Sequence, residues 1–109
     1  MRRTFAILAA VLSTSATAWA AGEPEFNLVL EGHRFKPDRV EVPAGRKLKF
    51  LVENKDATPS EFESETLKVE KVIPGKGKAT VFVGPLKPGE YKFFDEYNEK
   101  TATGVVVAK

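Results

Sequence analysis

The sequence predicts an all-β fold, an antiparallel β-sandwich of about seven strands, and three observations lead to it. Short apolar or alternating segments recur at roughly ten-residue intervals. Gly and Pro separate these segments, and no stretch supports a long helix or a nucleotide-binding loop. The expected strands are 26–30, 40–42, 48–52, 69–73, 79–83, 91–95 and 105–108.

The segment 48–52 is the clearest strand, because Leu48, Phe50 and Val52 fall on one face of an extended chain. The polar stretch that follows contains Pro59 and reads as a loop. Residues 60–67 leave two interpretations open. The letters S-E-F-E resemble a helix-capping start, whereas alternating glutamates also fit an extended segment.

A strand, a loop and a second strand are expected near the end of the chain. Pro88-Gly89 predicts a turn before the strand at 91–95, and the loop from Asp95 to Thr103 is rich in oxygen-bearing side chains. Gly104 opens the closing strand. The aromatic residues that we assign to core packing are Phe50, Phe82, Tyr91 and Phe93.

Residues 1–20 have the three parts of a cleaved signal peptide. Arg2 and Arg3 precede an apolar run from Phe5 to Leu12, and Ala18-Trp19-Ala20 provides a small-residue cleavage site. The apolar run is too short to span a bilayer by itself. We therefore expect residues 21–109 to form one exported domain.

The charge of that domain is balanced. The whole chain has 17 Lys and Arg against 15 Asp and Glu, and both arginines of the signal are lost on cleavage. No basic surplus remains to displace counterions from DNA or RNA, so no nucleic-acid partner is expected. The chain has no Cys, which excludes disulfides and thiolate metal ligands.

Two acidic clusters are the candidate site. Glu61, Glu63 and Glu65 form the first, with Glu70 as a candidate extension, and residues 95–99 contribute Asp95, Glu96 and Glu99 to the second. Carboxylates repel one another unless a cation lies between them, so folding that joined the clusters would favour metal binding. An independent enzyme is not indicated, since no nucleophile stands with a base; any oxidation would be metal-centred, with a partner as a candidate requirement for turnover.

The chain resembles a cupredoxin over nearly all of residues 21–109. The resemblance is carried by the segments V-E-V-P-A-G, K-F-L-V-E-N-K-D-A-T-P-S-E-F and P-L-K-P-G-E-Y-K-F-F-D-E-Y-N-E-K-T-A-T-G-V-V-V. It implies a Greek-key sandwich. In the positions of the family's copper ligands stand Glu61 for the first His, Asp95 for the Cys, Asn98 for the second His and Thr101 for the Met. Without the thiolate, blue-copper electron transfer does not carry over.

The segments E-F-E-S-E-T-L-K-V-E-K-V-I-P-G and G-P-L-K-P-G-E-Y-K-F-F-D-E-Y are also similar to the cupredoxin-like periplasmic components of bacterial ferrous-iron uptake systems, the Ftr-type proteins and the N-terminal domain of EfeO. This resemblance implies a periplasmic protein that binds copper and iron and assists an inner-membrane iron permease, or another periplasmic uptake component. The residues that it matches are Glu61, Glu70, Asp95 and Glu96. Glu63 fits by neighbourhood, and Asn98 stands where the group has a His.

Two further residues need separate treatment. His33 is a candidate metal ligand, because the turn that it occupies can approach the same end of such a fold, but it also suits a solvent-facing turn. Tyr97 could be a phenol ligand, a hydrogen-bond donor to a carboxylate or a loop anchor, and we interpret it as a loop anchor. Two other functions remain open, a periplasmic copper carrier without a redox role and a metal-free interaction module that presents an acidic face. The oligomeric state does not follow from the sequence.

Overall fold

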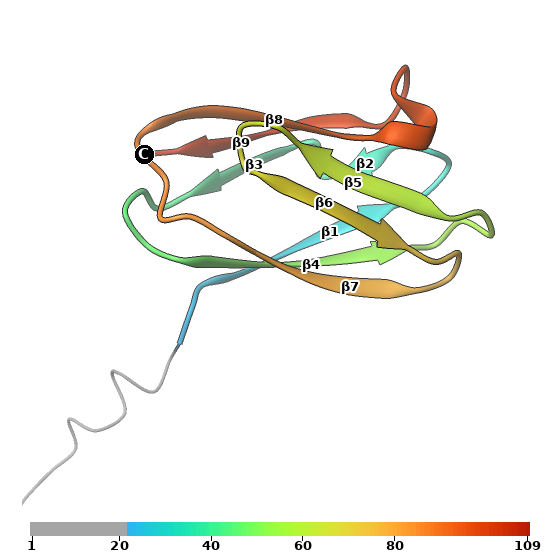
Figure 1. Ribbon diagram of the computed structural model, residues 1–109, viewed down its shortest axis with the longest axis horizontal. Coiled ribbons are helices and arrows are strands. Elements are labelled where there is room, and N and C mark those ends of the chain that lie inside the picture. Colours follow the sequence, from blue (N-terminus) through green and yellow to red (C-terminus); the bar gives the residue numbers. More distant parts are fainter. Residues whose placement is uncertain (1–21) are drawn as a thin grey trace, which may run out of the picture.

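The computed structural model describes residues 22–109, which form a sandwich of two β-sheets (Figure 1). The expected signal peptide lies outside the described residues. The elements are β1 (Glu25–Leu30), β2 (Phe35–Lys36), β3 (Arg39–Val42), β4 (Leu48–Asn54), β5 (Ser60–Ser64), β6 (Val69–Ile73), β7 (Lys78–Val83), β8 (Gly89–Asp95), the 3-10 helix η1 (Glu96–Asn98) and β9 (Thr103–Ala108).

The first sheet has the strand order β2-β1-β4-β7, and the second has β3-β9-β8-β5-β6. The sandwich prediction is confirmed, but both sheets are mixed, not purely antiparallel. β1 pairs with β4 in parallel, and β3 pairs with β9 in parallel. The chain changes sheets between β2 and β3 and again between β3 and β4, so strands that run the same way become neighbours.

Residues 60–64 form a strand, which settles the choice left open between helix and strand. β5 is hydrogen-bonded to β6 on one side and to β8 on the other. Pairing on both sides outweighs the local capping signal, because tertiary context overrides helix propensity. β5 and the two-residue β2 bring the described part of the chain to nine strands, against about seven expected.

The core lies between the two sheets and contains the inward-facing residues of each strand. Leu48, Phe50 and Val52 are fully buried, as their alternation predicts. Phe93 is also buried, and Tyr91 packs partly buried against the core. The assignment of Phe82 to the core is wrong: it is 50% exposed, because β7 turns its neighbours Val81 and Val83 inward.

Three aromatic rings fill the end of the core below β5. Phe62 lies 5.2 Å from Phe93 and 5.8 Å from Phe35 between ring centroids, and Phe35 lies 5.0 Å from Phe93. Edge-to-face and tilted contacts at these distances are favourable beyond simple burial. Because Phe62 points inward, its neighbours Glu61 and Glu63 must point to the outer face of the second sheet.

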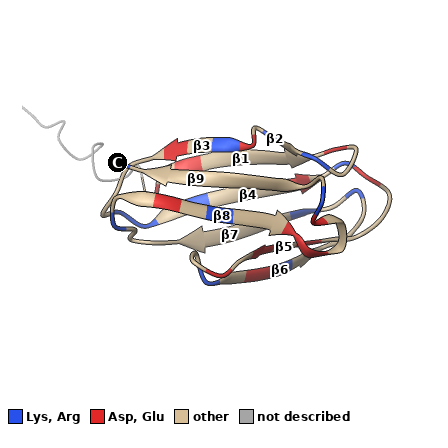
Figure 2. Ribbon diagram, turned by 90° about the horizontal axis from the view of Figure 1, so that it is seen from above, with Lys and Arg blue, Asp and Glu red and all other residues tan. Residues whose placement is uncertain are grey.

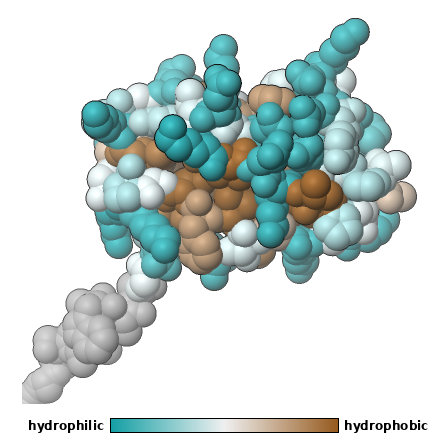
Figure 3. Space-filling model, viewed as in Figure 1, coloured by the Kyte–Doolittle hydropathy of each residue, from teal (hydrophilic) through white to brown (hydrophobic). Residues whose placement is uncertain are grey.

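Figure 3 shows apolar side chains at the middle of the face where β6 and β7 lie, bordered by hydrophilic ones. Val72 on β6 is 52% exposed.

Among the described residues, no helix has both the length and the apolar character needed to cross a membrane.

Candidate metal site

The strand register brings together glutamates from three separate segments. Glu63 on β5 is the direct partner of Glu70 on β6, and Glu61 lies two residues away on the same face of β5. Glu96 begins η1, immediately after β8, which is the other neighbour of β5. Figure 2 shows the acidic segments of β5, β6 and the end of β8 at one corner of the molecule.

One carboxylate oxygen from each of Glu61, Glu63, Glu70 and Glu96 lies within 4.8 Å of the others. We call these four residues the glutamate cluster. Hard cations bind oxygen at about 2.0–2.6 Å, so two oxygens on opposite sides of one ion are roughly 4–5 Å apart. All four carboxylates are therefore close enough to share a single cation. Glu65 is exposed beyond the end of β5 and is not in the cluster.

The cluster perturbs the titration of its own members. A side-chain hydrogen bond with Glu96, followed by burial and by the negative charges of Glu96 and Glu70, raises the pKa of Glu61 from 4.5 to about 7. Burial, followed by the charge of Glu96, raises the pKa of Glu63. Near neutral pH, Glu61 therefore exchanges readily between its protonated form and the carboxylate that a cation would bind.

Glu63 has an oxygen that lacks a partner. Its Oε1 is shielded from solvent and accepts no hydrogen bond, and it is the one buried side-chain polar atom of residues 22–109 in this condition. Buried oxygens normally have a partner, because leaving one unpaired is costly. None of the four ion pairs among the described residues involves the glutamate cluster, so no lysine or arginine neutralises it there. A cation would provide both the missing contact and the missing charge.

Asp95 lies beside the cluster but faces the interior. It is fully buried, and its Oδ1 accepts hydrogen bonds from the backbone N–H groups of Glu61 at 2.9 Å and Tyr97 at 3.0 Å. Its Oδ2 accepts from Ser60 Oγ at 2.8 Å and Asn98 Nδ2 at 3.0 Å. The carboxylate therefore ties β5 to the N-terminal end of η1, the two elements that carry Glu61 and Glu96. Asp95 stays a predicted ligand, but in the structure its hydrogen bonds hold β5 against η1.

The sequence interpretation missed two hydrogen-bond partners of Asp95. Asn98 is the residue that stands in place of a His ligand, and its amide donates to Asp95. Ser60 reads as a possible helix cap in the sequence, and its hydroxyl instead donates to the same carboxylate. A buried Asp next to a short helix is a recognisable capping signal, but its partner 35 residues away becomes visible only after folding.

His33 does not join the glutamate cluster. Its Nδ1 lies 3.5 Å from Asp56 Oδ2, and the backbone N–H groups of Gly32 and His33 donate to the same carboxylate at 2.8 and 2.9 Å. Burial opposes ionisation of Asp56, but these two hydrogen bonds and the charges of His33 and Lys76 lower its pKa overall. The turn between β1 and β2 lies at the same end of the sandwich as η1 (Figure 1), as expected, but the imidazole is engaged elsewhere. Its role as a ligand stays a prediction.

Asn54 orders the loop that leads into β5. It is fully buried, and its Nδ2 donates to the carbonyl oxygens of Thr58 at 2.8 Å and Pro74 at 3.2 Å, and its Oδ1 accepts from the N–H of Asp56 at 3.0 Å. These bonds tie the β4–β5 loop to the β6–β7 turn.

Tyr97 is 54% exposed, so its ring does not anchor the final loop as expected.

Comparisons with known proteins agree with this fold. The model of the cupredoxin-like domain family matches residues 4–108. An uncharacterised protein of Rickettsia prowazekii is 35% identical over 83 residues, which make up 76% of this chain and 66% of that protein. The chain thus spans about two thirds of that relative's length.

Several solved structures share the fold at low identity. Auracyanin A, a blue copper protein of Chloroflexus aurantiacus, superposes with a TM-score of 0.69 at 12% identity, covering 81% of this chain and all of that chain. The metal-binding domain of the Cu(I)-exporting ATPase CopA of Streptococcus pneumoniae gives 0.69 at 17% identity, covering 82% and 88%. A purple cupredoxin of Nitrosopumilus maritimus gives 0.59 at 15% identity, covering 76% and 98%.

The donor set of this chain does not fit a blue-copper centre. Such a centre requires a cysteine thiolate and two imidazoles, whereas this chain has no Cys, and its one His contacts Asp56. Every donor in the glutamate cluster is a carboxylate oxygen. The arrangement therefore suits hard or intermediate cations that accept oxygen ligands.

Proposed function

Because this chain belongs to the cupredoxin-like domain family, we propose that it binds iron or copper through the glutamate cluster and, in the periplasm, assists the oxidation of ferrous iron or its delivery to an inner-membrane iron permease. The observation that carries the proposal is the convergence of four carboxylates, one of which, that of Glu63, has a buried oxygen without a hydrogen-bond partner. Iron is here a substrate or cargo, and the chain's own residues provide the oxygen ligands.

The chemistry of the ligands favours the oxidised ion. Anionic oxygen ligands stabilise a more highly charged cation, so a site of carboxylates binds Fe(III) more tightly than Fe(II) and makes oxidation of the bound ion more favourable. Repulsion among the four carboxylates adds to the drive for binding. Proton release from Glu61 accompanies that binding, because its pKa is about 7 before the cation arrives.

Calorimetry of residues 21–109 with Fe(II) under anaerobic conditions, and separately with Cu(II), tests this function. Glu63→Gln removes the charge of the unpartnered carboxylate, and we expect it to weaken binding at least tenfold. Glu65→Gln is the matched control, since it removes a nearby charge that lies outside the cluster. At a hundredfold excess over the dissociation constant, the bound ion should stabilise the wild-type protein by about 2.7 kcal/mol.

Equal affinities for the wild type and Glu63→Gln would show that the ion is held elsewhere.

Oxygen consumption with Fe(II) tests the redox step. We expect the rate of consumption to rise above the uncatalysed rate with the wild type but not with Glu63→Gln. Cell fractionation tests the proposed location: the protein should appear in the periplasm with Ala21 as its first residue.

The second candidate is a copper carrier without a redox role. Auracyanin A is a blue copper protein, the CopA metal-binding domain was solved with Cu(I), and both folds match this one. This candidate uses the same glutamates, so it predicts binding of Cu(II) with no change in the rate of Fe(II) oxidation. A metal-free interaction module would instead show no thermal shift with any of these ions.

A further inference from the structure

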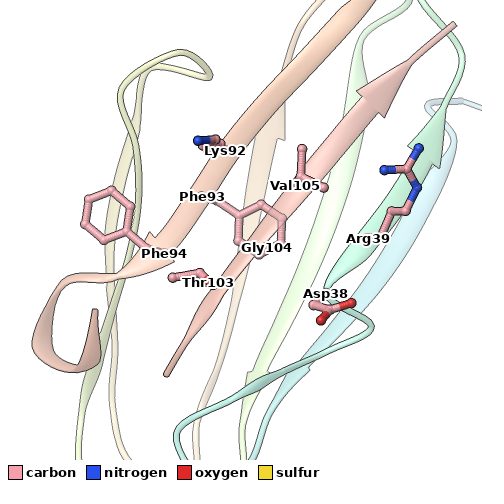
Figure 4. A pocket seen from close by; sticks show the side chains of 8 residues that line it. All are labelled: Asp38, Arg39, Lys92, Phe93, Phe94, Thr103, Gly104 and Val105. Atoms are coloured by element: carbon pink, nitrogen blue, oxygen red, sulfur yellow. The ribbon is translucent and has the colours of Figure 1, made fainter. Parts of the chain in front are cut away.

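We propose that a shallow groove on the outer face of the second sheet binds a small organic dicarboxylate between Lys92 and Arg39. The groove has a volume of about 530 Å³ and lies over β3, β9 and β8, as Figure 4 shows. Its floor includes Val105 and Gly104. None of its lining residues belongs to the glutamate cluster, so it is a separate site.

The register of the sheet places one cation on each side of an apolar residue. Val105 on β9 is paired with Lys92 on β8 and with Arg39 on β3. All three face outward, because the residue that follows each of them along its strand is buried. Two strand spacings of about 4.8 Å separate the backbones of Lys92 and Arg39. Both side chains are long enough to converge on the two ends of one short molecule.

Neither cation has an acidic partner. The ion pairs of the described residues are His33–Asp56, Lys36–Glu31, Lys49–Glu25 and Lys109–Glu41. Lys92 and Arg39 are in none of them. Glu41, two residues further along β3 on the same face as Arg39, is instead paired with Lys109 at 3.3 Å. The guanidinium of Arg39 offers a planar pair of donors that matches a carboxylate, and Lys92 adds a second positive charge.

The floor of the groove selects an organic anion over an inorganic one. Val105 and Phe94 are half-buried and present apolar surface between and beside the two cations. A phosphate or sulfate has no apolar part to cover this surface, whereas the methylene groups of a dicarboxylate do. The hydroxyl of Thr103 gives the groove a further polar contact.

One acid in the groove opposes the ligand and provides a test. Asp38 lines one end, next to Arg39, and Figure 4 shows its carboxylate there. Its negative charge weakens attraction for any anion in the groove. Asp38→Asn should therefore bind a dicarboxylate more tightly than the wild type, a gain that damage to the fold would not produce.

The experiment is a titration of isotope-labelled residues 21–109 with succinate, followed by amide NMR at constant ionic strength, after metal has been removed on a chelating resin. We expect saturable shifts at β3, β8 and β9. Lys92→Gln and Arg39→Gln should each weaken binding by about fivefold, and Asp38→Asn should tighten it by about twofold or more. Lys71→Gln, an exposed cation on β6 outside the groove, should leave the affinity unchanged.

Three results would overturn the proposal: no saturable shifts with millimolar succinate, an equal loss of affinity in Lys71→Gln, or phosphate binding as tightly as succinate. Because the resin removes metal from every sample, the outcome is independent of the proposed metal function. The amide spectra also report whether each variant is folded.

Discussion

Substitution of Asp95 by Asn tests how the glutamate cluster is held together. The new amide keeps one oxygen to accept from the N–H groups of Glu61 and Tyr97. Its NH₂ group replaces Oδ2, so the amide of Asn98 faces another donor, and the hydroxyl of Ser60 must rotate to accept.

The expected loss of stability follows from these contacts. An unpaired buried donor costs about 1–3 kcal/mol, and the two remaining bonds each lose about 0.5–1 kcal/mol when their acceptor becomes neutral. Relief of the desolvation of a buried charge offsets part of this loss. We expect the free energy of unfolding to fall by about 2–4 kcal/mol, which lowers the melting temperature by roughly 10–25 °C in a domain of this size.

Thermal unfolding followed by circular dichroism in EDTA measures this change. Asp38→Asn is the matched control: Asp38 is exposed, and its side chain makes no hydrogen bond or ion pair among the described residues, so its stability should change by less than about 0.5 kcal/mol. If the free energy of unfolding of Asp95→Asn lies within 0.5 kcal/mol or so, roughly the same margin, of the wild-type value, the hydrogen bonds of Asp95 do not hold β5 against η1.

Three other predictions concern the titration of the cluster and the packing beneath it. The pKa of Glu61 is raised from 4.5 to about 7 in the folded protein, so the folded state holds more protons than the unfolded state between these values. The contribution of Glu61 to stability is greatest below pH 4.5 and is lost as the pH rises through about 7. The melting temperature of the metal-free wild type should therefore fall between about pH 5.5 and pH 8, and it should fall less in Glu61→Gln. Phe62→Ala should cost about 3–5 kcal/mol in urea unfolding, whereas truncation of the exposed Val72 should cost under about 0.5 kcal/mol. Gly104→Ala would bring its Cβ into steric conflict with the ring of Phe93, and calorimetric unfolding should show a loss of about 1–3 kcal/mol.

The sequence alone determined the class of fold and part of the site. Alternation along 48–52 predicts the buried face of β4, since the side-chain period of a strand depends only on local geometry. The same alternation puts Glu61 and Glu63 on one face once residues 60–64 are extended. Phe82 shows where composition misleads: its aromatic side chain predicts a core position, whereas the alternation of β7 exposes it.

Only the tertiary structure decided which acids meet and which do not. Glu70 reaches Glu63 through the register of β5 against β6, and Glu96 reaches Glu61 because β8 lies on the other side of β5. Asp95 and Glu96 are adjacent in sequence, yet one carboxylate turns inward to four donors and the other turns outward to the cluster. These outcomes depend on pairings between strands far apart in the chain, which local patterns of charge and hydrophobicity do not specify.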